Sequence, residues 1–184
     1  ILTRLVGSEM CIRDSLSTGR IENLKPFLRK IRFVKCDLSK KGRWQNEFKG
    51  KCYIFHFAAL ADIVPSIQDP EKYYNSNVNG TLNLLQACRN AKVLKFLYSA
   101  SSSCYGIPKK YPTTEDEKIN TLYPYALTKR LGEELVLHWA NVYDIPAISL
   151  RLFNVYGPRS RTSGTYGAVF GVFLAQKLAK EPFT

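Results

Sequence analysis

The chain alternates short apolar runs with longer segments of helical spacing, and this alternation constrains its fold more than any other feature. Neighbouring side chains of a strand point to opposite faces, so a strand that is apolar throughout indicates a sheet covered on both faces. Helical spacing occupies residues 71–91 and 125–142, and a further helix is expected near Ala168. The pattern predicts an α/β fold built on a doubly wound parallel sheet, with strands at residues 31–36, 52–57, 95–100 and 147–152.

The 184 residues are enough for the core of one ordinary domain. No apolar run approaches the roughly 18 residues that cross a bilayer, so no membrane partner is expected. The opening ILTRLVGSEMCIRDS carries charges where a secretory signal needs an apolar stretch, which makes the cytoplasm the expected compartment.

The formal net charge of +12 is concentrated in the first third of the chain. Between Arg20 and Lys51, eleven Lys or Arg residues stand against three acids. Such an excess can attract a polyanion, or it can be a solvated helix face with lysine-rich turns. The sequence contains no nucleic-acid-binding motif or long basic tract, so we expect no nucleic-acid partner.

Five cysteines form neither a C-x-x-C pair nor an even disulfide set, and only two histidines are present. We therefore predict no metal site and reduced, mostly buried thiols at Cys11, Cys36, Cys52, Cys88 and Cys104.

Small, polar or acidic residues follow each predicted strand. Ligands of doubly wound sheets bind beyond the carboxyl ends of the strands, so these positions are candidates for a polar, phosphate-bearing ligand. Each is also compatible with ordinary packing or turn formation. In strand order they are Asp37 and Leu38; Ala58, Ala59 and Ala61; Ser101, Ser102 and Ser103; and Phe153 and Asn154.

Tyr125 and Lys129 lie four residues apart in a predicted helix and can therefore face the same pocket, with Gly132 leaving that face open. A free phenol has a pKa of about 10, so a tyrosine works as an acid or base near neutral pH only if its phenolate is stabilised. A nearby ammonium does this, and Ser101 can hydrogen-bond the same substrate oxygen. A lone Y-x-x-x-K also occurs by chance in many helices.

Several motifs occur in a fixed order: HFAALAD at 56–62, NVNGTLNLLQAC at 77–88, S-S-S-x-Y-G at 101–106, YPYALTK at 123–129 and RLFNVYGPR at 151–159. In this order they resemble the extended short-chain dehydrogenases that act on nucleotide sugars, and within them the 4-epimerases of the UDP-glucose type. The resemblance runs from Leu16 onward. It implies a Rossmann-like domain, NAD as cofactor, a nucleotide-sugar substrate and a homodimer.

The resemblance also assigns roles. It implies that Tyr125 is the general acid/base, that Lys129 lowers the pKa of Tyr125 and holds the nicotinamide ribose, and that Ser101 orients the sugar hydroxyl. The substrate side would further include Ser102, Ser103 and Asn154. The cofactor side would comprise Asp37, Leu38, Ala58, Ala59, Ala61, Asn77, Tyr125, Lys129 and Phe153.

The implied reaction is epimerisation at C4 by transient oxidation and hydride return. Family dehydratases and decarboxylases place an acid one or two positions after the residue equivalent to Ser101, whereas this chain has Ser102 and Ser103 there. This favours the epimerase over a 4,6-dehydratase or decarboxylase. A non-catalytic dinucleotide-binding sensor is a third alternative, although a sensor has no need of the Ser, Tyr and Lys set.

The chain departs from the family at its start, where no G-x-x-G-x-x-G phosphate loop is present. We expect a chain that lacks the first βα unit and most of the C-terminal substrate lobe, and that binds NAD poorly. Expected divisions are a non-native leader at 1–15, a partial NAD-binding domain with the catalytic helix at 16–165, and the start of the substrate lobe at 166–184. Asp14 matches the family's acid for the adenosine ribose, a match that is accidental if the leader is foreign.

Overall fold

The computed structural model describes residues 10–48, 53–159 and 169–183. Its strands are β1 (Met10–Asp14), β2 (Ile31–Lys35), β3 (Tyr53–His56), β4 (Lys95–Ser101) and β5 (Ala147–Leu152). Its α-helices are α1 (Ile63–Gln68), α2 (Pro70–Tyr74), α3 (Gly80–Ala91), α4 (Pro124–Tyr143) and α5 (Val169–Ala179). Shorter helical turns are η2 (Ile21–Phe27), η3 (Arg43–Phe48), η4 (Asn75–Asn79) and η5 (Ser102–Tyr105).

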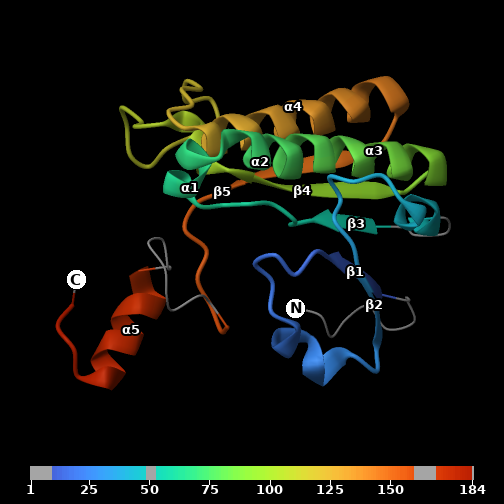
Figure 1. Cartoon of the computed structure of the whole chain (residues 1–184). Helices are drawn as coiled ribbons and strands as arrows, with labels where there is room; N and C mark the ends of the chain where they lie inside the picture. Colours follow the sequence, from blue (N-terminus) through green and yellow to red (C-terminus); the bar gives the residue numbers. More distant parts are fainter. Residues whose placement is uncertain (1–9, 49–52, 160–168, 184) are drawn as a thin grey trace.

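The strands form two parallel sheets (Figure 1). One has the order β3-β4-β5, and the other pairs β1 with β2. The four predicted strands and the α/β class with parallel sheets are confirmed, and each predicted strand agrees with the observed one to within a residue at either end. Strand β1 was not predicted: it lies inside the stretch expected to be a leader and pairs along its whole length with β2.

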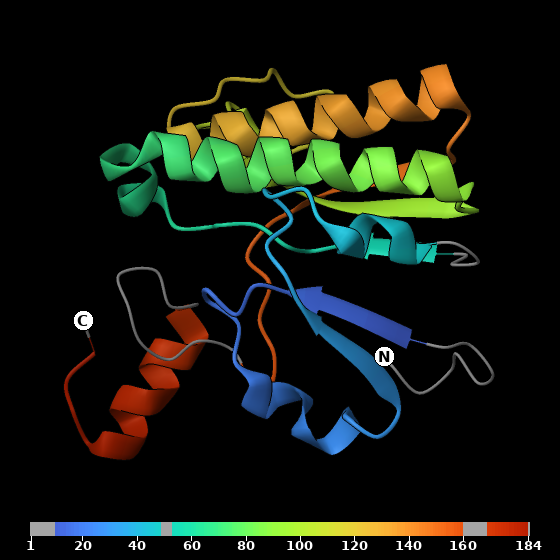
Figure 2. The ribbon, with the colours of Figure 1, turned by 45° about the vertical axis from the view of Figure 1, so that its right-hand side comes forward.

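Helices α3 and α4 cover one face of the β3-β4-β5 sheet (Figures 1 and 2). Between them and the sheet lies the main core, which includes Phe96, Tyr98, Leu85 and Val136, each at most 1% exposed. Helix α4 begins with Pro124, whose fixed φ suits the first helical position, and it ends before Asp144 in the left-handed conformation. The core therefore forms where the apolar sides of two long helices meet the sheet.

The opposite face of this sheet is open. Phe55, Leu97 and Ile148 stand in register across the three strands, and Phe55 and Ile148 are 54% and 43% exposed. Leu150, two residues on from Ile148, is 40% exposed on the same face. We predicted that both faces of the sheet would be covered by other elements. Within the described residues, only the face beneath α3 and α4 is covered.

The predicted helix at 71–91 is confirmed as a nearly continuous helical segment, interrupted by a π-helical turn at η4. The side chain of Asp69 caps α2 by accepting a hydrogen bond of 3.1 Å from the backbone nitrogen of Lys72. A π-turn changes which side chains face inward, and here it coincides with the burial of Asn77, which is 2% exposed.

Gly132 does not leave its helix face open, contrary to expectation. A Cβ atom at this position would lie 2.3 Å from the hydroxyl oxygen of Tyr98. The glycine instead allows α4 to approach β4 closely, which seats Tyr98 beneath the helix, where its hydroxyl donates to the Lys129 carbonyl at 3.3 Å.

The β1-β2 sheet is packed more loosely than the β3-β4-β5 sheet. No residue from 10 to 40 is fully buried. This sheet is tied to the rest of the protein by Arg13, which pairs with Glu47 at 3.2 Å, and by the Asn83 amide, which donates to the carbonyls of Leu38 and Ser39. These ties connect the β1-β2 sheet to η3 and α3, and Figure 2 shows it below β3 as a separate sheet.

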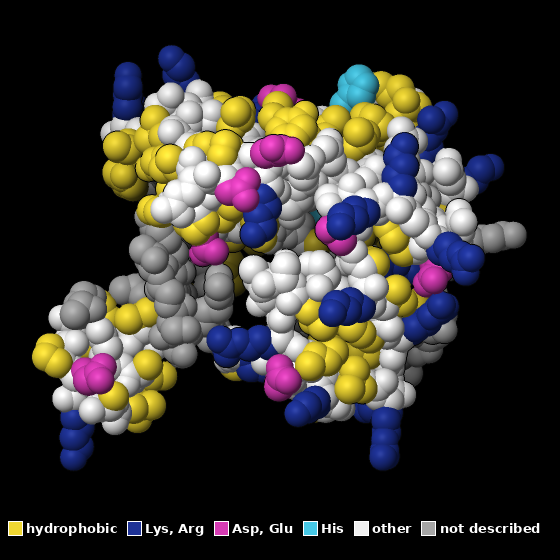
Figure 3. Space-filling model, viewed as in Figure 1, with side chains coloured by type: hydrophobic (Ala, Val, Ile, Leu, Met, Phe, Trp, Pro, Cys, Tyr) yellow, Lys and Arg dark blue, Asp and Glu magenta, His cyan; other side chains and the backbone are white. Residues whose placement is uncertain are grey.

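Helix α5 begins close to the predicted residue, Ala168. Among the described residues, Cys11, Cys36, Cys88 and Cys104 are free thiols, while Cys52 lies outside the described residues. Within those same ranges no cluster of His, Cys, Asp or Glu is arranged to hold a metal ion. No helix in the described part of the chain combines the length and apolar character needed to span a bilayer. Figure 3 shows Lys and Arg spread over the visible face, with Asp and Glu among them.

Candidate active site

Tyr125 and Ser101 meet at the carboxyl end of β4. Ser101 is the last residue of that strand, and Tyr125 lies in the first turn of α4. The Tyr125 hydroxyl donates to Ser101 Oγ at 3.3 Å, which is long for two hydroxyls. The backbone nitrogen of Tyr125 donates to Ser66 Oγ at 3.1 Å, so α1 also fixes the start of α4.

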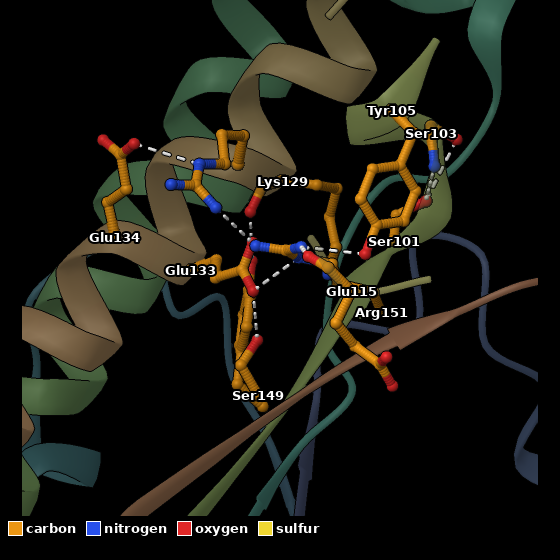
Figure 4. A network of polar contacts seen from close by, with 11 residues as sticks. Ser101, Ser103, Tyr105, Glu115, Lys129, Glu133, Glu134, Ser149 and Arg151 are labelled. Carbon is orange, nitrogen blue, oxygen red and sulfur yellow. Dashed lines mark hydrogen bonds and ion pairs between the residues drawn. The ribbon is translucent and has the colours of Figure 1, made fainter. Parts of the chain in front are cut away.

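Ser101 is held by the turn that follows it. Its Oγ accepts from the backbone nitrogen of Ser103 at 3.2 Å and donates to Ser103 Oγ at 3.0 Å, capping η5 (Figure 4). The Ser101 residue is only 7% exposed. The Ser101 backbone is fixed by pairing with Leu152 of β5, while its Oγ contacts both η5 and the Tyr125 phenol.

Lys129 lies one turn further along α4 and is 4% exposed. Its ammonium donates to the Ser99 carbonyl on β4 and lies 4.5 Å from the centre of the Tyr98 ring. Burial lowers the pKa of Lys129 to about 8, although the Glu133 carboxylate acts in the opposite direction. The structure thus directs Lys129, Tyr125 and Ser101 toward the same end of β4.

We expected Lys129 to lower the pKa of Tyr125, but in this structure the pKa of Tyr125 is raised. Burial raises the pKa of Tyr125 above its usual value, the Ser101 hydrogen bond lowers it, and the negative charge of Asp62 raises it. The ammonium of Lys129 is directed to a backbone carbonyl instead. The phenol is therefore neutral at pH 7 in this arrangement.

Asn77, predicted to contact the cofactor, holds the loop after β3. Its Oδ1 accepts from the backbone nitrogen of Leu60 at 2.8 Å, and its Nδ2 donates to the Leu60 carbonyl at 3.0 Å and to Thr128 Oγ1 at 3.1 Å. One buried amide thus links this loop to the helix that carries Tyr125.

A polar pocket lies where the carboxyl ends of β1, β2 and β3 converge. Its lining includes four predicted cofactor residues, which are Asp37, Leu38, Ala58 and Ala59. The Asp37 carboxylate accepts from the backbone nitrogen and the hydroxyl of Ser39, at 2.9 and 2.7 Å. The remaining predicted residues, Ala61, Phe153 and Asn154, are exposed, the first in the loop after β3 and the others after β5.

Three residues of this region were missed from the sequence as site residues. Asp14 ends β1 and lines the polar pocket. Its signal was a match to the resembled family, which the leader interpretation had set aside. Asp62 acts electrostatically on Tyr125, and its only signal in the sequence is its place at the end of the HFAALAD motif. Ser66 gave no signal, because only the tertiary fold brings it to Tyr125.

The family model for the NAD dependent epimerase/dehydratase family matches residues 6–184. A UDP-glucose 4-epimerase of Lactobacillus helveticus is 36% identical over 157 residues, which are 84% of this chain and 46% of that protein. The UDP-N-acetylglucosamine 4-epimerase of Methanobrevibacter ruminantium M1, solved with UDP-N-acetylmuramic acid, has a TM-score of 0.88 and 34% identity, covering 93% of this chain and 55% of that one.

The UDP-glucose 4-epimerase of Brucella ovis, solved with NAD, has a TM-score of 0.73 and 35% identity, covering 80% of this chain and 45% of that one. The chain spans about half the length of these relatives. It belongs to the NAD-dependent epimerase/dehydratase family.

Proposed function

We propose that the chain carries the proton-transfer residues and part of the cofactor cleft of an NAD-dependent nucleotide-sugar 4-epimerase. The observation that carries this proposal is the 3.3 Å hydrogen bond from the Tyr125 phenol to Ser101 at the carboxyl end of β4. The names of the similar proteins support the 4-epimerase activity and a UDP-sugar substrate. The proposal includes a homodimer formed through α4 and its neighbouring helix.

The residues present fit NAD in part. The polar pocket offers carboxylates at Asp14 and Asp37, and carboxylates are suitable acceptors for ribose hydroxyls. Ala58 and Ala59 let a flat ligand approach the backbone after β3. The described residues contain no glycine-rich phosphate loop, so the fit covers the adenosine side and the Lys129 end of the cleft.

The proposed chemistry of the chain's own residues is a proton transfer. Ser101 hydrogen-bonds the sugar C4 oxygen and holds it against the Tyr125 phenol. Tyr125, once deprotonated, takes the proton of the C4 hydroxyl and returns it to the same oxygen in the second half of the reaction. NAD, when bound, accepts the hydride from C4 and gives it back. In the proposal the positive charge of Lys129 favours the phenolate once its ammonium turns from the Ser99 carbonyl, which it contacts in this structure, toward Tyr125.

Hydroxyls rather than carboxylates follow Ser101, and this supports epimerisation over dehydration. Ser102 and Ser103 occupy η5, and the Ser103 hydroxyl bonds to Ser101. Asp62 is the acid whose charge acts on Tyr125, and it comes from the loop after β3. The Asp62 carboxylate near Tyr125 is the one structural feature that favours a 4,6-dehydratase, so the reaction product must be identified.

The test is incubation with NAD and UDP-glucose, followed by separation of the products, and it uses a full-length family protein that contains these residues, because the chain itself is expected to bind NAD poorly and spans about half the length of its relatives. We expect UDP-galactose to form and the rate to fall about 10²- to 10⁴-fold in Tyr125→Phe, the usual contribution of a general acid/base. Binding of NAD, measured by calorimetry, should change little in that variant. A 4-keto-6-deoxy sugar would indicate the dehydratase, and released carbon dioxide the decarboxylase.

Unchanged epimerisation in Tyr125→Phe would place the acid/base elsewhere. Salt-sensitive nucleic-acid binding without turnover of any sugar would favour the sensor.

A further inference from the structure

A buried carboxylate connects three elements beneath the candidate site. Glu133 of α4, whose side chain is 4% exposed, accepts hydrogen bonds from Ser149 at 3.0 Å and from Arg151 Nε at 3.0 and 3.2 Å (Figure 4). Arg130 reaches the same carboxylate at 3.0 Å from one turn earlier on α4. Glu133 is thus fully engaged, and it joins α4 to β5.

Arg151 has a second set of partners on its other side. Its Nη1 donates to the Tyr105 hydroxyl at 2.8 Å and to the Glu115 carbonyl at 3.0 Å. Its guanidinium carbon lies 5.1 Å from the centre of the Tyr105 ring. Tyr105 is the last residue of η5, the turn that Ser101 caps. A planar guanidinium can bond on two sides at once, which a lysine ammonium at the same position cannot reproduce.

These contacts form a closed path, here called the ring, that includes the Tyr125 phenol. The ring runs from Glu133 on α4 to Arg151 on β5, then to Tyr105 on η5 and Ser101 at the end of β4, and returns to α4 at Tyr125. Glu133 and Tyr125, where the ring leaves and rejoins α4, lie on the same helix. The Ser101 backbone is paired with Leu152, but its hydroxyl is oriented by Ser103 of η5, so moving η5 away from Arg151 would reorient this hydroxyl relative to Tyr125.

We propose that Arg151, anchored by Glu133, is a positioning residue that holds η5 so that the Ser101 hydroxyl stays within hydrogen-bond reach of Tyr125. This inference rests on the proposed function of Ser101 and Tyr125. The inference gives the Arg151–Glu133 ion pair a role in positioning Ser101, because a contribution to folding stability is a weak explanation for a buried ion pair. Replacing a buried ion pair by apolar residues is often neutral or stabilising, whereas breaking it leaves an uncompensated charge.

The experiment observes Tyr125 directly. Tyrosine labelled with ¹³C at Cζ is incorporated, and the Tyr125 resonance is assigned by its loss in Tyr125→Phe. The Cζ shift responds to hydrogen bonding of the phenol. We expect Ser101→Ala to shift this resonance, and Arg151→Met and Tyr105→Phe to shift it in the same direction. Tyr105→Phe removes only the hydroxyl and keeps the buried ion pair, so it serves if Arg151→Met fails to fold.

Arg130→Met is the matched control. Arg130 contacts the same Glu133 carboxylate, and its second ion pair is with the exposed Glu134 at 3.0 Å, so it makes no hydrogen bond to η5 among the described residues. We expect it to leave the Tyr125 resonance in place. Amide hydrogen exchange supplies a second readout, because the backbone nitrogens of Ser103 and Gly106 are bonded within this turn. Both should lose protection in Arg151→Met and keep it in Arg130→Met.

A double-mutant cycle separates positioning from general destabilisation. If Arg151 acts through Ser101, adding Arg151→Met to Ser101→Ala causes no further shift of the Tyr125 resonance. In Arg151→Lys the Tyr125 resonance should return at most part of the way to its position in the unchanged protein. An unmoved resonance in both Arg151→Met and Tyr105→Phe overturns the proposal, and so does an equal shift in Arg130→Met. No substrate or cofactor is present in these measurements, so their outcome is independent of whether the chain epimerises a sugar.

Discussion

Neighbouring residues of each strand in the β3-β4-β5 sheet point to opposite faces, and these two faces have opposite environments. On the covered face, Phe96, Tyr98 and His56 are packed beneath α3 and α4. On the open face, Phe55 and Ile148 are about half exposed. Both faces carry apolar side chains, so composition does not distinguish them. The difference teaches that stability and candidate chemistry share one face, where buried groups such as Lys129 are held between α4 and β4.

The largest expected effect comes from a matched pair of phenylalanines on neighbouring strands. Phe96 is fully buried and Phe55 is 54% exposed. Phe96→Ala removes a core ring and should lower the free energy of unfolding by about 3–5 kcal/mol. Phe55→Ala should cost about 1 kcal/mol or less, because much of that ring is already in water. Urea denaturation of the two variants measures both values, and equal losses would show that the open face is covered in solution.

A pair of helical glycines tests how tightly the covered face is packed. Gly132→Ala places a methyl group 2.3 Å from the Tyr98 hydroxyl and should cost about 1–3 kcal/mol through overpacking. Gly80→Ala meets atoms no closer than 3.5 Å, so its effect should be near zero or stabilising by up to about 1 kcal/mol, since alanine favours helix. Thermal melting distinguishes the pair. A well-tolerated Gly132→Ala would mean that Tyr98 can move out from beneath α4.

The covered face should also respond to acid through His56. Burial, helped by the Lys129 charge, lowers the pKa of His56 to about 3, and the ring is paired with Thr81 Oγ1 at 2.8 Å. The unfolded chain binds this proton near pH 6.5, so the stabilising contribution is complete above pH 6.5 and is lost as pH falls toward 3. Between pH 7 and 5 we expect a loss of about 2 kcal/mol from this group. Denaturation at both pH values should show a smaller loss in His56→Gln.

Lys129 should show the smallest net effect, with a pH dependence of the same sign as that of His56 but in a higher pH range. Its lowered pKa of about 8 means that burying the charged form costs stability below pH 8, and this cost is relieved as pH rises from 8 toward 10.5. Lys129→Met should therefore raise the free energy of unfolding at pH 7 by about 1–2 kcal/mol, since the lost hydrogen bond to Ser99 offsets part of the gain. The gain should shrink above pH 8. A destabilised Lys129→Met at pH 7 would contradict this.

The sequence by itself determined the α/β class and the four strands from β2 to β5, because apolar periodicity is local and survives without coordinates. The order of the motifs marked Tyr125 and Ser101 as candidates for contact with one substrate oxygen, and those roles stay a prediction. Strand β1 escaped prediction because its five residues mix apolar and charged side chains, and only pairing with β2 makes them a strand. Likewise, spacing placed Lys129 on the same helix face as Tyr125 but could not say that its ammonium would bond to Ser99.

Only the tertiary structure decided which groups act on one another across distant segments. Asp62 and Ser66 act on Tyr125 from the start of α1, and Arg151 of β5 contacts Tyr105 in η5. It also decided which face of the β3-β4-β5 sheet is buried, since that depends on where α3 and α4 lie and not on the strands' own residues. Local pattern specifies an element, whereas charge and burial depend on neighbours brought together by folding.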